Sequence, residues 1–159
     1  MSDAVLPRAR SLGGKALFVI VASEFNYHFV EGLVNHATTE LRAQAPEAEV
    51  LLIRVPGAFE IPVAVKEIAQ DERVDAVLAM GVILQGETEH AAHLARSVTD
   101  ALQRIALEEH VPVINCVLSL TNELQAKERC HGEKINRGTE AARAAVKIAG
   151  VMRQLRARG

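Results

Sequence analysis

The segment VDAVLAM at residues 74–80, with GVILQGETEH at residues 81–90 directly after it, says most about the fold of this chain. The first part is a short apolar run without strict alternation, which predicts a strand covered on both faces. The second part contains Gly81 and Gly86 and leads into a stretch with helical spacing of apolar residues. Together they indicate a buried strand, a glycine-containing loop and an amphipathic helix.

Three further apolar runs have the same character, at residues 16–22 (ALFVIVA), 50–55 (VLLIRV) and 111–118 (VPVINCVL). Helical spacing separates each run from the next, so the predicted order is β-α-β-α-β-α-β-α, with another helix at the end. This order is typical of a three-layer α/β sandwich with a doubly wound, four-stranded parallel sheet and right-handed crossovers. Ligands bind such sheets beyond the carboxyl ends of the strands. The loops of interest therefore begin near Ser23, Pro56, Gly81 and Ser119.

The expected helices show local signals as well as periodicity. Pro62 suits the first turn of the helix after the second run, where a missing N–H is tolerated. A short helix is expected at residues 122–129, and Gly132 and Gly138 are expected to break the pattern after it. The three longer helices have the apolar faces Phe29, Leu33, Val34, Ala37 and Leu41; Ala91, Leu94, Ala95, Val98, Ala101, Leu102, Ile105 and Ala106; and Ala141, Ala144, Ala145, Ile148, Ala149 and Met152.

The composition excludes several classes of protein. Of the 159 residues, 49% are hydrophobic and 24% are charged, which supplies one core and excludes wholesale disorder. A net charge of −2 excludes a strongly basic nucleic-acid binder, and four Phe, one Tyr and no Trp are too few for a base-stacking platform. Cys116 and Cys130 cannot make a disulfide framework, so a reducing cytoplasm is expected.

No segment is typical of a membrane span or a targeting signal. The longest apolar-rich run, at residues 76–84, is far shorter than the roughly 20 residues that cross a bilayer. Residues 1–15 contain Pro7 and two glycines and lack the apolar core of a signal peptide. We expect residues 1–15 to form a flexible or docking arm and residues 16–159 to form a single domain.

The first two loops carry aromatic residues that fit either a flat ligand or the core. Phe25 follows the first strand and either stacks on a ligand at the mouth of the sheet or caps the core. The Pro-Gly pair in VPGAFEIP indicates a turn, and the amides after it are candidate ligand contacts, namely those of Ala58, Phe59 and Glu60. The simpler alternative is a plain strand-to-helix turn with Phe59 in the core and Glu60 at the helix N-terminus.

The third loop has the features of a phosphate site. A helix N-terminus behind Gly86 offers free N–H groups and the positive end of the helix dipole, and Thr88 is a candidate cap for that helix. His90 lies in the first turn, and the pKa range of a histidine suits proton transfer near neutral pH. The simpler alternative is a solvated histidine in an ordinary capped helix. Glu87 and Glu89 repel an anion unless their side chains point outward.

The fourth region, KERCHGEKINRGTEAA, offers a further phosphate contact. Arg129 precedes a glycine-containing loop and is a candidate partner for a phosphate, although a surface arginine is the commoner explanation. Cys130 lacks the partners of a catalytic thiol, so we do not assign it as a nucleophile. His93 lies one turn after His90, but no third ligand accompanies the pair, so no metal site is predicted.

Taken together and in this order, the four regions resemble one known family. SEFN after the first strand, VPGAFEIPVA after the second, AMGVILQGETEH after the third, PVINCVL at the fourth and KERC…INRGTEAA beyond it are similar to the motifs of the 6,7-dimethyl-8-ribityllumazine synthases. The likeness covers residues 16–157, and the combination of PGAFEIP with the GxTxH element is specific. It implies a flavodoxin-like fold and an enzyme that needs neither cofactor nor metal.

The resemblance also implies a reaction and a set of site residues. The reaction condenses 5-amino-6-(D-ribitylamino)uracil with 3,4-dihydroxy-2-butanone 4-phosphate, releases phosphate and water, and is the penultimate step of riboflavin biosynthesis. His90 takes the acid/base role, and Phe25 stacks on the pyrimidinedione. The implied substrate contacts are Phe25, Ala58, Phe59, Glu60, Val82, Ile83, Leu84 and Asn115. The implied phosphate contacts are Gly86, Glu87, Thr88 and Arg129.

Three residues depart from the family pattern. Gln85 stands where a basic residue is common, Asn115 where Phe is frequent, and Glu24 where many members have Arg. These departures keep two alternatives open, an active synthase and a catalytically weakened member that binds flavin or lumazine or forms a shell. An unrelated flavodoxin-like module, expected to be a monomer, is the third hypothesis.

The resemblance implies assembly as well. Members of the family form pentamers, and some build an icosahedral capsid from them, with active sites between subunits. Asn115 and Arg129 are therefore expected to come from the neighbour of the chain that carries Phe25 and His90, and the N-terminal arm is expected to dock on a neighbour or add a strand to it. The implied partners are the two small-molecule substrates and further copies of the chain as a pentamer, decamer or sixty-subunit shell, with riboflavin synthase as another candidate. Neither nucleic acid nor a membrane is expected as a partner.

Overall fold

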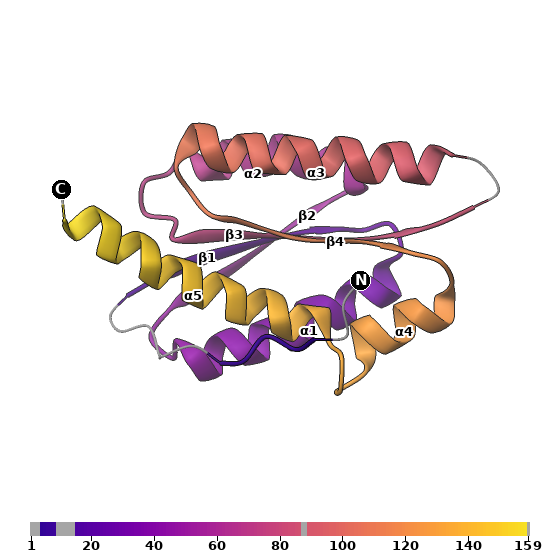
Figure 1. Ribbon diagram of the computed structural model, residues 1–159, viewed down its shortest axis with the longest axis horizontal. Coiled ribbons are helices and arrows are strands. Elements are labelled where there is room, and N and C mark those ends of the chain that lie inside the picture. Colours follow the sequence, from indigo (N-terminus) through magenta and orange to yellow (C-terminus); the bar gives the residue numbers. More distant parts are fainter. Residues whose placement is uncertain (1–3, 9–14, 87–88, 159) are drawn as a thin grey trace.

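The computed structural model describes residues 4–8, 15–86 and 89–158. Its centre is a parallel four-stranded sheet of β1 (Leu17–Ser23), β2 (Glu49–Val55), β3 (Ala76–Leu84) and β4 (Val113–Leu120), in the order β2-β1-β3-β4 (Figure 1). The helices are α1 (Tyr27–Gln44), α2 (Ile61–Ala69), α3 (His90–Glu109), α4 (Glu123–His131) and α5 (Arg137–Ala157), and a short 3-10 helix, η1 (Ala58–Glu60), precedes α2. The predicted element order and parallel sheet are confirmed.

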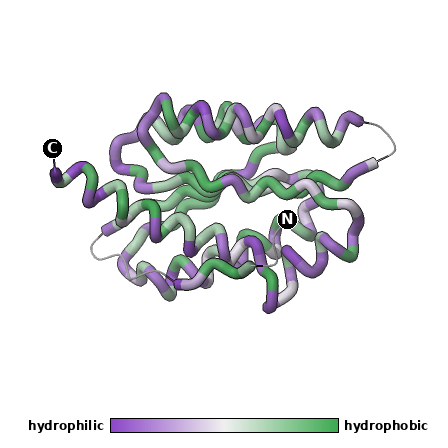
Figure 2. The backbone as a smooth tube through the Cα atoms, viewed as in Figure 1, coloured by the Kyte–Doolittle hydropathy of each residue, from purple (hydrophilic) through white to green (hydrophobic). Residues whose placement is uncertain are grey.

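Helices cover both faces of the sheet and make three layers (Figure 1). α2 and α3 lie on one face, and α1, α4 and α5 lie on the other. Alternate residues of β1 enter the two cores, with Phe18 and Ile20 on the side of α1 and α5 and Val19 and Val21 on the side of α2 and α3. Figure 2 shows the hydrophobic residues gathered along the central strands. Among the helices of the described segments, none is long and apolar enough to cross a membrane.

The third strand is longer than the sequence predicts. We expected a loop to begin at Gly81, but β3 continues to Leu84 because its pairing with β4 runs on to the pair Leu84–Leu120. A Cβ at Gly81 would lie 3.3 Å from both Ile61 Cδ1 and Ser23 Oγ. This glycine therefore relieves crowding inside the strand. The loop begins only after Leu84, where the strand ends.

The prediction that Gly138 breaks the helical pattern is wrong. Gly138 is buried in the first turn of α5, where a Cβ would overlap the carbonyl oxygen of Leu33 on α1. Its missing side chain allows two helices to approach closely. Two other local predictions are confirmed, because Pro62 lies in the first turn of α2 and a short helix follows Asn122. The Asn122 side chain caps that helix by accepting a hydrogen bond from the Gln125 N–H at 2.9 Å.

β2 is less buried than its apolar sequence predicts. Leu51, Leu52 and Ile53 are 41%, 44% and 41% exposed. The cause is topology, because β2 lies at the edge of the described sheet, beside β1. An apolar edge strand is a surface on which another chain can dock.

The described part of the N-terminal arm, residues 4–8, lies against the chain's own α1 and α5. Arg143 donates to the carbonyl oxygen of Leu6 at 2.8 Å. Arg8 donates to the two carboxylate oxygens of Glu40 at 3.0 and 2.8 Å, and Arg143 donates to Glu40 at 2.6 Å. The arm is thus anchored at these residues by a cluster of one buried carboxylate and two guanidinium groups.

Both cysteines are buried free thiols. Burial raises the pKa of the Cys130 thiol to about 12, and it also raises the pKa of Cys116. The thiolate is the nucleophilic form of cysteine, and burial suppresses it at both positions. This chemistry agrees with leaving Cys130 out of the candidate site.

Candidate active site

A pocket of about 250 Å³ lies at the carboxyl edge of the sheet, where β1, η1, β3 and α3 meet. Its lining residues are Ser23, Phe25, Ala58, Val82, Ile83, Leu84, His90, Ala91 and Leu94. The sequence predicts most of them as site residues, and the fold brings together Phe25, Ala58, Val82, Ile83, Leu84 and His90. No motif indicates Ser23 as a lining residue. Ala91 and Leu94 are predicted only as part of the helix core, because helical spacing indicates burial but not the pocket.

The end of β1 fixes Phe25 at the mouth of this pocket. The Phe25 N–H donates to the carbonyl oxygen of Pro56 at 3.0 Å, which ties the residue to the loop after β2. The Phe25 residue is 71% exposed, so the alternative in which it caps the core is wrong. An exposed aromatic ring beside a pocket is available to stack on a planar ligand.

Asn26 is a structural element of the site that sequence reasoning missed. Its backbone has a φ of 57°, in the left-handed region that Asn tolerates better than most residues. Its side-chain Nδ2 donates to the carbonyl oxygen of Val82 at 2.7 Å. This bond joins the loop after β1 to the end of β3, beyond the last β1–β3 pair, Ala22–Met80. Val82 is one of the residues that the resemblance assigns to substrate contact, and its carbonyl oxygen accepts this hydrogen bond.

His90 is the first residue of α3 and lines the pocket with an exposed side chain. Ala91 and Leu94 of the same helix add apolar surface beside it. His93 pairs instead with Glu89 at 3.5 Å, and both of these side chains are strongly exposed. No group of three or more His, Cys, Asp or Glu side chains in the described part of the chain is arranged to hold a metal ion.

The predicted phosphate loop is described only in part. Gly86 is exposed, and nothing in the described chain lies within 4 Å of the position that its Cβ would occupy. The N–H of the preceding residue, Gln85, donates to the carbonyl oxygen of Leu120 at 2.9 Å and holds the start of the loop on β4. Glu87 and Thr88 lie outside the described residues, so the cap and the phosphate contacts expected there stay predictions.

The turn after β2 brings only part of its segment to the pocket. Ala58 lines the pocket, whereas Phe59 is 69% exposed and is not the core residue of the simpler alternative. The Glu60 N–H donates to the carbonyl oxygen of Gly57 at 3.2 Å, so this amide is engaged within η1 rather than presented to a ligand. Gly57 has a φ of −148°, an extended conformation that does not require glycine.

Asn115 and Arg129 are not among the described residues that line this pocket. Asn115 pairs in register with Ala79, in the middle of β3, and its Nδ2 donates to Thr99 Oγ1 at 3.2 Å. Arg129 is 8% exposed near the end of α4, with its Nη1 atom 3.7 Å from Glu128 Oε2, so it is not a surface arginine. The expectation that a neighbouring subunit supplies both residues stays a prediction.

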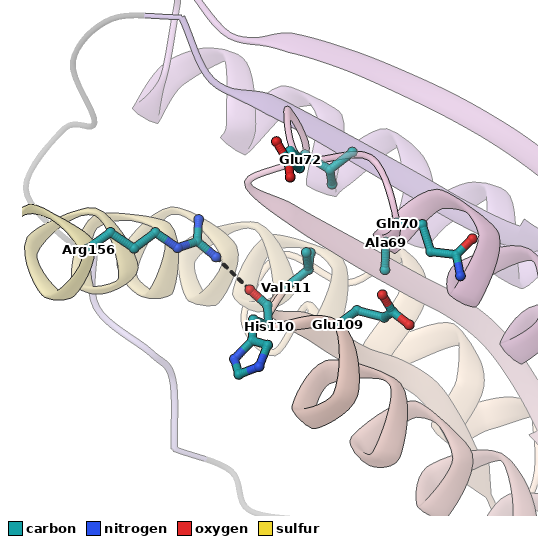
Figure 3. A pocket seen from close by; sticks show the side chains of 8 residues that line it. Ala69, Gln70, Glu72, Glu109, His110, Val111 and Arg156 are labelled. Atoms are coloured by element: carbon teal, nitrogen blue, oxygen red, sulfur yellow. Dashed lines mark hydrogen bonds between the residues drawn. The ribbon is translucent and has the colours of Figure 1, made fainter. Parts of the chain in front are cut away.

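A larger hollow of about 410 Å³ lies at the amino end of the sheet (Figure 3). Two of its charged groups are already engaged by the fold. Glu109 pairs with Lys66 at 2.6 Å, and Arg156 donates to the carbonyl oxygen of His110 at 2.5 Å. We therefore assign the candidate site to the smaller pocket, at the edge where parallel α/β sheets bind ligands. The larger hollow is lined by Ala69, Gln70, Glu72, Val74, Glu109, His110, Val111 and Arg156.

Comparisons with known proteins identify the family. The family model described as 6,7-dimethyl-8-ribityllumazine synthase matches residues 15–153. A protein of that name from Halorhodospira halophila is 39% identical over 143 residues, which is 89% of this chain and 92% of the relative. The namesake from Aquifex aeolicus is 39% identical over 87% of this chain and 91% of its own length, and the one from Nitrosomonas europaea is 36% identical over 94% and 90%. Because this match spans the strands, the pocket and the helices around it, the chain belongs to the 6,7-dimethyl-8-ribityllumazine synthase family.

Proposed function

We propose that this chain condenses 5-amino-6-(D-ribitylamino)uracil with 3,4-dihydroxy-2-butanone 4-phosphate to form 6,7-dimethyl-8-ribityllumazine, with release of phosphate and water. The observation that carries the proposal is that Phe25, the end of β3 and His90 line one pocket at the carboxyl edge of the sheet. This reaction needs a planar ring to stack on the pyrimidinedione, backbone groups along the edge of that ring and a titratable side chain to transfer protons. The product is the direct precursor of riboflavin.

The pocket suits the pyrimidinedione ring. Phe25 stacks on one face of the ring, and the strand end at Val82, Ile83 and Leu84 lies along its edge. The ribityl chain extends over the turn after β2, at Ala58, Phe59 and Glu60. Phe25 and Phe59 are 71% and 69% exposed as residues, which supports a role in contacting something outside the isolated chain.

His90 moves protons in the proposed reaction. The substrate amine attacks the ketone and forms an imine with loss of one water, phosphate is then eliminated, and the second amine closes the ring on the remaining carbonyl with loss of a second water. Each step transfers a proton, and the exposure of His90 at the start of α3, beside the pocket, supports a role in accepting and returning it. Holding the two substrates side by side contributes more, because it makes a reaction between two molecules effectively unimolecular.

The phosphate group is proposed to bind in the loop before α3. The resemblance assigns this role to Gly86, Glu87 and Thr88, through backbone N–H groups and the Thr88 hydroxyl. Arg129 of a neighbouring subunit adds a positive charge, which favours departure of the anion. The burial of Arg129 supports this role, because a largely desolvated guanidinium interacts more strongly with an anion than a fully hydrated one does.

We infer that the working enzyme is an oligomer of this chain, with a pentamer as its unit. The exposed apolar edge of β2, at Leu51, Leu52 and Ile53, supports burial against another copy. Val63 on α2 is a further exposed apolar side chain, at 73%. The position of Asn115 outside the pocket of its own chain supports a site shared between subunits. Native mass spectrometry tests the proposal, and a monomer would contradict it.

The test of the activity is an assay with both substrates, followed by the absorbance and fluorescence of the lumazine after subtraction of the uncatalysed reaction. His90→Ala is expected to lower kcat about tenfold or more. His93→Ala, one turn further along α3 and paired with Glu89, is the matched control and is expected to keep the original rate. A folded oligomer that binds lumazine but makes none would instead support the alternative of a binding or shell-forming member.

Replacing Arg129 tests the phosphate site separately. Arg129→Ala is expected to raise KM for the butanone phosphate by about tenfold or more, because a hydrogen bond to a charged group contributes about 1.5–3 kcal/mol. KM for the uracil substrate is expected to change much less. Equal changes in both KM values would refute the phosphate role of Arg129.

A further inference from the structure

The last turn of α4 is seated against α1 at Gly32. A Cβ at Gly32 would lie 2.5 Å from the Cys130 carbonyl oxygen and 2.6 and 2.7 Å from the Cε1 and Nδ1 atoms of His131. These contacts are too close for any side chain, so the imidazole of His131 rests directly on the backbone of α1. The position of α4 along and around α1 is therefore set at this point.

A hydrogen bond and a ring contact hold His131 in this seat. Its Nε2 lies 3.0 Å from the carbonyl oxygen of His28, one turn before Gly32 on α1. A carbonyl oxygen only accepts, so Nε2 carries the proton and donates. The rings of His28 and His131 are also in contact, with centroids 4.7 Å apart at an angle of 37°. Phe29 adds a ring 6.3 Å from that of His131.

The backbone on either side of His131 is fixed as well. Asn136, which is 4% exposed, donates through Nδ2 to the carbonyl oxygens of Cys130 at 3.1 Å and Gly132 at 2.9 Å. The same side chain accepts from the Thr139 N–H at 3.1 Å and caps α5. His131 therefore projects from a turn whose neighbouring carbonyl groups are both held, so its bond to α1 fixes the orientation of that turn.

Arg129 lies two residues before His131 in the same turn. Residues two apart differ by roughly 200° around a helix, so the side that faces α1 and the side that carries Arg129 are nearly opposite. We propose that His131 is a positioning residue, which sets the rotation of the last turn of α4 and thereby holds the Arg129 guanidinium where it binds the substrate phosphate. This proposal rests on the phosphate role proposed for Arg129.

The test uses steady-state kinetics of the assembled enzyme with variants that separate the parts of the contact. His131→Phe keeps a ring of similar size and removes the donor, whereas His131→Gln keeps a side-chain N–H donor. The matched control is His36→Ala. His36 is partly buried like His131, but it lies on α1. KM for the butanone phosphate, KM for the uracil and the inhibition constant of inorganic phosphate are measured for each, also in an Arg129→Ala background.

We expect His131→Phe to raise KM for the butanone phosphate and the inhibition constant of phosphate by about five- to tenfold, as for loss of one hydrogen bond. KM for the uracil is expected to stay within about twofold, and His131→Gln and His36→Ala are expected to stay near the original values. In the Arg129→Ala background, His131→Phe is expected to add less than about twofold, because coupled residues are not additive.

Three results overturn the proposal, and they distinguish its own failure from failure of the function on which it rests. If Arg129→Ala weakens the phosphorylated substrate but His131→Phe weakens it by the same factor with and without Arg129, His131 does not act through Arg129. If both KM values rise together, its role is only structural. If Arg129→Ala itself has no effect, the phosphate role falls and the positioning role falls with it. Should His131→Phe fail to assemble, His131→Asn, whose amide is too short to reach His28, replaces it in the same comparison with His131→Gln.

Discussion

Replacing Gly138 with Ala tests how closely α5 approaches α1. Besides overlapping the Leu33 carbonyl oxygen, the added Cβ would lie 2.9 Å from Leu33 Cα and 3.0 Å from its carbonyl carbon. Carbon atoms in contact are normally about 3.5–4.0 Å apart, so the two helices must separate by roughly 0.5–1 Å. Because the crowded atoms belong to the backbone, no side-chain rotation relieves the overlap. Overpacking of this kind costs about 1–3 kcal/mol, against a gain of about 0.5–1 kcal/mol from replacing a helical glycine.

We therefore expect Gly138→Ala to lower the free energy of unfolding by about 0.5–2 kcal/mol, as the difference between these two effects. Urea unfolding measures this free energy, and the m value is expected to stay unchanged. The two proteins are compared at equal protomer concentration, because association adds stability. Gly86→Ala is the control, since nothing described lies within 4 Å of its Cβ position, and its stability should change by less than about 0.5 kcal/mol. A Gly138→Ala protein as stable as the original would refute the close contact between α1 and α5.

Two further predictions concern Asn115 and the anchor of the arm. Asn115→Phe is expected to tighten lumazine binding by about three- to tenfold through an added ring contact, measured by fluorescence titration, and an unchanged Kd would place Asn115 outside the ring pocket of the assembled enzyme. The Arg8 and Arg143 guanidinium groups hold the pKa of Glu40 below its usual value of 4.5, so its carboxylate stabilises the fold above that pH, and the contribution is lost as pH falls through the lowered pKa. Glu40→Gln is therefore expected to be less stable at neutral pH and to lose less stability on acidification; parallel pH profiles of the two proteins would contradict this.

Local patterns were enough to predict the elements and the edge that holds the site. The apolar run at residues 16–22 predicts β1 to within one residue, and Pro62 predicts the start of α2. Since all four strands are parallel, the segments after them gather at one edge. That rule places Phe25 and His90 near each other although 65 positions separate them in the numbering, and they do line one pocket.

Other features depend on contacts that no local pattern encodes. Asn26 bonds to Val82 across 56 residues, and His131 bonds to His28 across 103. The sequence predicts Gly138 as a helix breaker, because the residue type alone does not distinguish a glycine that ends a helix from one that lets another helix approach. Apolar periodicity and capping residues come from neighbours within a few positions, and the alternation of strands and helices along the chain indicates a parallel sheet, so the sequence specified these. Only the packing of distant segments settled how α1 meets α4 and α5 on one face of the sheet, that Arg129 is buried and that β2 is left exposed, because these depend on distances between segments far apart in the chain.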